Sequence, residues 1–196
     1  MIQRKTLHPA KVLDRFGLVG FWRDRRGVSA VEFAFIAPVM VLIFFGVAEL
    51  SSAMMSERRA SDVASTIGDL VARCSGVNDA DITDIFSAGN TIIDPFPQAN
   101  LKMRLTSIRG DASGNPQVDW TKNVNWSAGS ATGMPAGMIT AKDESVIIAE
   151  SSFTYTSVAK YVIKNGITVN EKFYLKPRKS TWVGLTSGGS TPICKD

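Results

Sequence analysis

A glycine and a glutamate, separated by four residues, stand at the start of a long apolar run, and their types and spacing suggest chemistry. Gly27 follows two arginines, and Glu32 is the only charged residue between Gly27 and Glu49. An ionised carboxylate in hydrocarbon is costly, so an acid within a membrane segment is a candidate functional group. The alternative is that Glu32, about 7 Å from the start of the run, merely extends its side chain to the lipid headgroups.

The apolar run is long enough to cross a bilayer. Residues 28–48 would form a helix of about 31 Å, which matches a hydrocarbon core of about 30 Å. Pro38 removes a backbone hydrogen bond from such a helix and bends it. The sequence therefore predicts a transmembrane helix over residues 28–50 with a kink at Pro38, and we expect Glu49 to be the first residue in water.

The distribution of charge indicates how this helix is oriented. Residues 1–27 carry seven basic and two acidic residues, a net +5, and because the whole chain is +4 the remainder is −1. Lys and Arg stay on the cytoplasmic side of a membrane helix, which predicts a cytoplasmic leader over residues 1–27 and an exported domain after the helix. That domain is near neutral and lacks the basic balance of a nucleic-acid-binding protein.

Gly27 precedes the apolar run, whereas the cleavage site of an ordinary secretory signal follows it. The stretch Gly-Val-Ser-Ala-Val-Glu-Phe, residues 27–33, resembles the type IV pilin processing site, in which a prepilin peptidase cuts after Gly and a Glu stands fifth after the bond. The wider run from Arg25 through Pro38 to Glu49 is similar to the TadE/TadG-like pseudopilins of the tight-adherence machinery, which assembles Flp pili. Val28 departs from many type IV pilins, which carry Phe at this position.

This resemblance implies roles for four residues. Gly27 and Val28 would form the cleavage site, and Glu32 and Phe33 would act in processing and assembly. A cut after Gly27 leaves a charged α-amine on Val28, and an amine attracts a carboxylate strongly at low dielectric. Glu32 of one subunit would then neutralise the amine of its neighbour and set the stagger between them.

The same resemblance implies a minor pilin-like subunit of the bacterial inner membrane, with a cytoplasmic N-terminus and a C-terminal domain that is periplasmic or outside. Its expected partners are a prepilin peptidase, sibling pseudopilins and pilin, an inner-membrane assembly platform with its ATPase, and membrane lipid. The rival interpretation is an uncleaved single-pass anchor whose soluble domain binds a ligand or a cell-wall component.

The rest of the chain predicts an α+β domain on a helical stem. Residues 51–73 lack proline and continue the helix, with an apolar stripe that packs on the domain or on a partner helix: Leu50, Met54, Val63, Ile67, Leu70 and Val71. Residues 74–196 are expected to form a pilin-like antiparallel sheet of about four strands, over 101–108, 117–126, 145–157 and 167–175. We expect a short helix over 81–87, loops over 75–79 and 127–137, and a tail from Thr181 to Asp196 that is loose unless Cys194 holds it.

The two cysteines, Cys74 and Cys194, lie at opposite ends of this predicted domain. An oxidising envelope compartment allows them to pair, and closing a loop of this length is worth roughly 4–5 kcal/mol on the loop-entropy model. Free thiols or a bond between chains are the alternatives. A metal site would need more ligands than these two residues provide.

The sequence gives no sign of an enzyme or of a cofactor site. The only histidine, His8, lies in the leader, so the remainder lacks the residue that zinc motifs and Ser-His-Asp triads need. Ser157 and Lys160 match a Ser-x-x-Lys pattern, but its partner motifs are missing and it follows a predicted strand. Neither a metal site nor a catalytic residue is therefore predicted.

Overall fold

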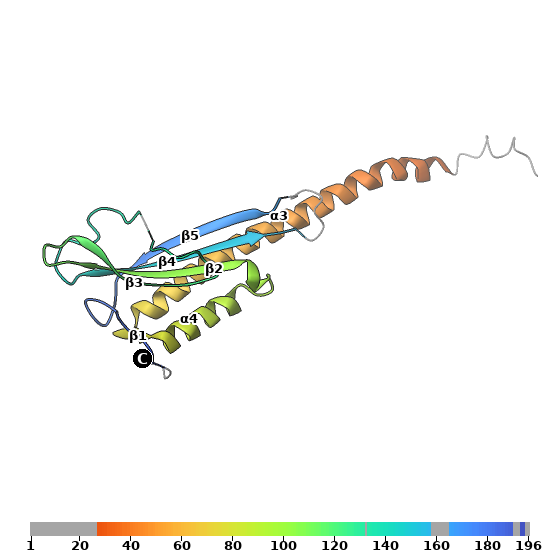
Figure 1. Ribbon diagram of the computed structural model, residues 1–196. Helices are drawn as coiled ribbons and strands as arrows, with labels where there is room; N and C mark the ends of the chain where they lie inside the picture. Colours follow the sequence, from red (N-terminus) through yellow and green to blue (C-terminus); the bar gives the residue numbers. More distant parts are fainter. Residues whose placement is uncertain (1–26, 132, 158–164, 190–192, 195–196) are drawn as a thin grey trace, which may run out of the picture. The chain divides into compact units, whose positions relative to one another are not determined.

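The computed structural model describes residues 27–131, 133–157, 165–189 and 193–194 (Figure 1). The chain divides into two compact units, of which the first ends at Phe45 and the second begins at Gly46. Helix α3 (Val28–Ala72) begins in the first unit and ends in the second. Its length confirms the prediction of a long N-terminal helix that continues past the apolar run.

The first unit, as far as it is described, is the apolar part of α3. Large side chains are exposed all round this helix, and Phe35 is 77% exposed. Among the described residues, α3 is the one helix that is long and apolar enough to cross a membrane. A helix that is apolar on every side is suited to lipid, so this unit fits a single-pass membrane anchor.

The second unit is built on a four-stranded antiparallel sheet of order β3-β2-β4-β5. Its strands are β2 (Leu101–Gly110), β3 (Pro116–Val124), β4 (Ser145–Tyr155) and β5 (Ile167–Leu175). Alternation along β2 buries Leu101, Met103 and Leu105 completely on one face. The predicted α+β class and the sheet are confirmed.

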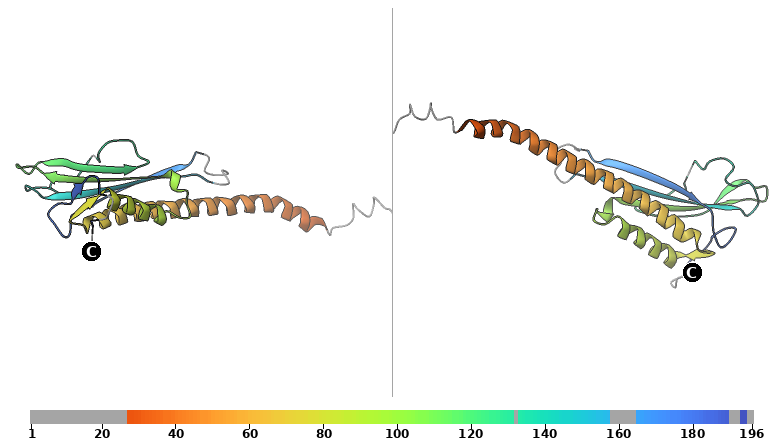
Figure 2. Two further views of the ribbon diagram at one scale, coloured as in Figure 1. Left: turned by 60° about the horizontal axis from the view of Figure 1, so that its bottom comes forward. Right: turned by 180° about the vertical axis from the view of Figure 1, so that it is seen from behind.

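The C-terminal part of α3 and helix α4 (Asp79–Ile92) cover one face of this sheet, as Figure 2 shows. The hydroxyl of Ser151 on β4 donates a hydrogen bond of 2.7 Å to the buried carbonyl of Ala60 on α3. A Cβ at Gly68 would lie 2.9 Å from the Cβ of Ala149, so glycine allows the helix to approach the sheet closely. On the opposite face, loop residues between β3 and β4 bury a second apolar cluster that includes Ile108, Val146 and Ile148.

Helix α4 is longer than the helix predicted over 81–87. The side chain of Asn78 accepts a bond from the amide of Asp81, and the carboxylate of Asp81 accepts one from the amide of Asn78, which forms a capping box. The helix passes through Gly89, a poor helix former, because the missing side chain makes room for Val63, Ile67 and Met103.

The predicted loop over residues 75–79 is wrong in part. The tail from Thr181 is held by the disulfide at Cys194, the one anchor that the sequence suggested, and also by a short strand. Strand β1 (Gly76–Asn78) pairs in parallel with β6 (Gly184–Thr186) to form a separate two-stranded sheet. Each strand has three residues, so neither carries a periodic signal that sequence reasoning can detect. The described residues of the predicted loop over 127–137 contain no helix or strand.

Candidate functional site: the N-terminal helix and its junction with the domain

The residues of the predicted cleavage site stand at the very start of α3. The helix begins at Val28, and Gly27 before it is exposed, with nothing within 4 Å of the position that a Cβ would occupy. Glu32 and Phe33 follow one turn later and are exposed, Phe33 by 67%. Because Glu32 is four residues after Val28, the two side chains share one face of the helix.

Pro38 lies inside the apolar part of α3, as the sequence places it. Its nitrogen carries no hydrogen and cannot donate to the carbonyl of Ala34, one turn earlier. In a membrane such a carbonyl must find another donor or be covered by a neighbouring helix. The small residues around it, Ala34 and Ala37, leave space for that approach.

Glu49 is placed differently from the prediction that it would be the first residue in water. It is only 6% exposed, and its carboxylate accepts a hydrogen bond of 2.6 Å from the hydroxyl of Ser157, just after β4. Both residues belong to the second unit, so this bond ties the start of the helical stem to the sheet. Ser157 is the serine of the Ser-x-x-Lys pattern, whereas Lys160 lies outside the described residues.

Comparison with known proteins gives one match. Residues 27–68 fit the family model of TadE-like proteins. This N-terminal segment is TadE-like. The match begins at Gly27 and ends at Gly68, where α3 packs against β4. No curated protein and no solved structure matches the chain.

The match likens residues 27–68 to TadE-like proteins and does not extend over the rest of the chain. The described residues hold no group of three or more His, Cys, Asp or Glu side chains arranged to bind a metal ion.

Helix α3 continues to carry apolar side chains after the apolar run, residues 28–48, has ended. Val63, Ile67 and Val71 of the predicted stripe are completely buried, but Leu50 and Met54 are exposed. The stripe was therefore predicted correctly only in its C-terminal half. Near the junction, the small side chains of Ala53, Ser56 and Ala60 face the domain instead.

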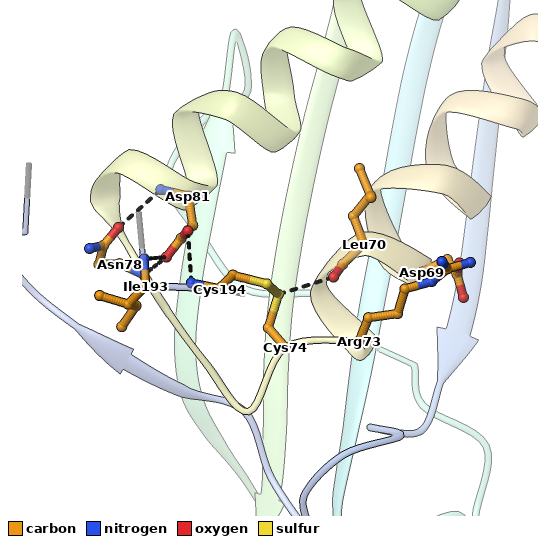
Figure 3. The surroundings of a disulfide bond; sticks show 8 residues. All are labelled: Asp69, Leu70, Arg73, Cys74, Asn78, Asp81, Ile193 and Cys194. Carbon is orange, nitrogen blue, oxygen red and sulfur yellow. Dashed lines mark hydrogen bonds and ion pairs between the residues drawn. A yellow bond between two sulfur atoms is a disulfide. The ribbon is translucent and has the colours of Figure 1, made fainter. Parts of the chain in front are cut away.

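A disulfide joins Cys74, just after the TadE-like match, to Cys194, with the two Cα atoms 5.2 Å apart (Figure 3). The carboxylate of Asp81 lies beside it and accepts hydrogen bonds from the amides of Ile193 and Cys194. Asp79 accepts bonds from the Lys122 ammonium and the Gly188 amide, and these two donors lower its pKa, Lys122 most strongly.

Sequence reasoning missed the polar residues that organise the junction and the C-terminal end of the domain. Glu49 and Ser157 are 108 residues apart, and Asp81 is 113 residues from Cys194. The Asn-Asp-Ala-Asp stretch at residues 78–81 is a detectable helix start, because Asn is a strong N-cap residue and an acid stands three positions later. No local sequence pattern predicts the hydrogen bonds that this stretch makes to the C-terminal tail.

Proposed function

We propose that this chain is a minor pilin-like subunit, a pseudopilin needed to assemble a Flp or tight-adherence pilus, and that a prepilin peptidase cleaves it after Gly27. The order of the parts carries the proposal. A glycine ends a basic leader, a helix begins at the next residue, and a carboxylate follows one turn into an apolar span. The TadE-like match over the same residues supports it.

Cleavage would create the group with which Glu32 acts. The new α-amine of Val28 is charged near neutral pH, and Glu32 is exposed, with no hydrogen bond or ion pair to another described residue. Opposite charges attract strongly in hydrocarbon, because water does not screen them. A Glu32 carboxylate that neutralises the amine of a neighbouring subunit would fix the axial stagger of the two helices.

The proposed partners follow from cleavage and the assembly step after it. The prepilin peptidase removes the basic leader, the inner-membrane platform and its ATPase extract the helix from lipid, and sibling pseudopilins and pilin receive it. The net charge of +5 in residues 1–27 supports a cytoplasmic N-terminus in the bacterial inner membrane, with the second unit periplasmic or outside.

Intact-mass analysis of membrane-purified protein tests the cleavage. In cells that contain an active prepilin peptidase, the mature chain is expected to begin at Val28. Gly27→Leu is expected to keep Met1, because a large side chain replaces the hydrogen beside the scissile bond. Ser29→Ala, which leaves Gly27 unchanged, is the matched control and is expected to be cut like the wild type. A wild-type chain that keeps Met1 would instead favour the uncleaved single-pass anchor.

A further inference from the structure

The C-terminal residues 177–189 and 193–194, here called the C-terminal strap, are fixed to the domain in two sections. The first section is held without sulfur. The amide of Arg178 donates to the carbonyl of Ala72 at 2.8 Å, and the indole of Trp120 donates to the carbonyl of Val183 at 2.8 Å. Pairing of β6 with β1 completes this section.

The second section of the strap depends on the start of α4 and on the disulfide. The amide of Gly188 donates to Asp79 at 3.0 Å, and the amides of Ile193 and Cys194 donate to Asp81 at 3.2 and 3.1 Å. Figure 3 shows that Asp81 binds the amides of Ile193 and Cys194, and that the disulfide holds the second of these residues as well. These hydrogen bonds and the disulfide form one small cluster. Cleavage of the S–S bond therefore directly affects the hydrogen bonds that hold this section.

The two cysteine residues differ in exposure. Cys74 is 1% exposed, whereas Cys194 is half-buried. Both line a cavity of about 280 Å³ between the end of α3 and the start of α4, together with Arg73 and Asp84. Because Cys74 is almost completely buried, we expect a nucleophile that enters this cavity to reach the sulfur of Cys194 more readily than that of Cys74.

The surroundings of Cys74 suit a thiol as well as a disulfide. Its sulfur lies 3.2 Å from the carbonyl oxygen of Leu70, one helical turn earlier. A reduced Cys74 can donate its S–H to that oxygen and stay buried. Asp81, for its part, keeps the amide of Asn78 as a donor at 2.8 Å if the strap leaves. Neither residue is then left without a hydrogen-bond partner.

We propose that an external dithiol exchanges with the Cys74–Cys194 disulfide by attack on the sulfur of Cys194, and that this opens only the second section of the strap. The partner's thiolate forms a bond to the Cys194 sulfur, and Cys74 leaves as a thiolate that takes a proton. The partner's second thiolate then attacks its own bonded sulfur and releases Cys194. The protein disulfide gains two electrons and the dithiol becomes a disulfide; the reverse reaction closes the strap. This proposal does not depend on the pilus role.

Trapping with glutathione tests which sulfur is attacked. The oxidised full-length chain in detergent is treated briefly with reduced glutathione, quenched with N-ethylmaleimide and mapped by peptide mass. Glutathione is expected on Cys194 and maleimide on Cys74, by more than about tenfold over the opposite pattern. Equal labelling, or glutathione mainly on Cys74, would overturn the assignment of the attacked sulfur.

Hydrogen exchange of the full chain, with and without dithiothreitol, tests the extent of opening. Reduction is expected to leave the amides of Gly188, Ile193 and Cys194 unprotected at the shortest labelling times. Strands β2 and β4 are expected to remain protected, although less than before, because loss of the disulfide also lowers the stability of the whole domain. A doubly substituted chain, Cys74→Ser with Cys194→Ser, is expected to match the reduced wild type and to ignore dithiothreitol. Complete loss of protection throughout β2 and β4, or unchanged protection in the strap, refutes the confined opening.

Discussion

At the scale of single residues, Glu32 places one carboxylate in a segment that otherwise carries no charge up to Glu49. Glu32→Gln keeps the size of the side chain and removes its charge, so we expect the variant to be cleaved and inserted normally but to lose pilus assembly by more than about tenfold. Pilus yield and intact mass measure the two effects. Glu57→Ala, an exposed acid on the same helix, should assemble normally. Normal assembly of Glu32→Gln would remove charge pairing from the mechanism.

Glu49 acts through a buried hydrogen bond. Glu49→Ala removes the acceptor of the Ser157 hydroxyl, and we expect the free energy of unfolding to fall by about 1–3 kcal/mol. Chemical denaturation of the full chain in detergent measures this change. Glu57→Ala again serves as the control and should change stability by less than about 0.5 kcal/mol. Equal effects of the two substitutions would contradict a structural role for the junction bond.

Glu144 gives the domain a pH-dependent contact between β4 and β5. The Lys176 ammonium, followed by the Thr140 amide, lowers the pKa of Glu144 from 4.5 to about 2. A depressed pKa adds stability that is present above 4.5 and is lost as the pH falls toward 2. We therefore expect the difference in melting temperature between wild type and Glu144→Gln to shrink across this interval. A difference that is constant from pH 5 to pH 2 would contradict the pairing.

At the scale of elements, the approach of α3 to the sheet depends on Gly68. A Cβ there would lie 2.9 Å from the Cβ of Ala149, which cannot move without the backbone of β4. We expect Gly68→Ala to lower the free energy of unfolding by about 1–3 kcal/mol, although alanine favours the helix. Gly89→Ala on α4 is the matched comparison, because its nearest obstacle is the flexible Met103 side chain. Denaturant midpoints should therefore fall further for Gly68→Ala.

The elements also show which parts of the fold local sequence predicts. Strands β2 and β4 were predicted because they extend over ten and eleven consecutive residues. Apolar and polar residues alternate along β2, and β4 contains a continuous apolar run. The apolar start of α3 was predicted in the same way. Strands β1 and β6 were missed, since a three-residue strand is stabilised only by a partner 108 residues away. The continuation of α4 through Gly89 and the burial of Glu49 likewise depend on contacts that form only after the chain has folded.

At the scale of the whole molecule, the resemblance from Arg25 to Glu49 and the family match over residues 27–68 overlap on the same N-terminal segment, and the family match does not extend beyond it. The described domain closes on itself through the C-terminal strap, which returns to Cys74 at the end of α3. One covalent bond therefore links the end of the TadE-like helix to the end of the domain. The effect of this disulfide on the folded structure can be measured separately from its effect on the unfolded chain.

Reduction of the disulfide should change global stability far more than it changes the folded structure. The bond spans 120 residues, and the loop-entropy model assigns about 5 kcal/mol to such a closure, because the bond restricts the unfolded chain. We expect dithiothreitol to lower the free energy of unfolding by up to this amount. Denaturant titrations that monitor the fluorescence of Trp120 and Trp182 measure this change. The denaturant m-value should rise, since the reduced unfolded chain is more expanded. The Cys74→Ser, Cys194→Ser chain is the control and should be insensitive to dithiothreitol. An unchanged unfolding free energy on reduction would mean that the bond does not close this loop.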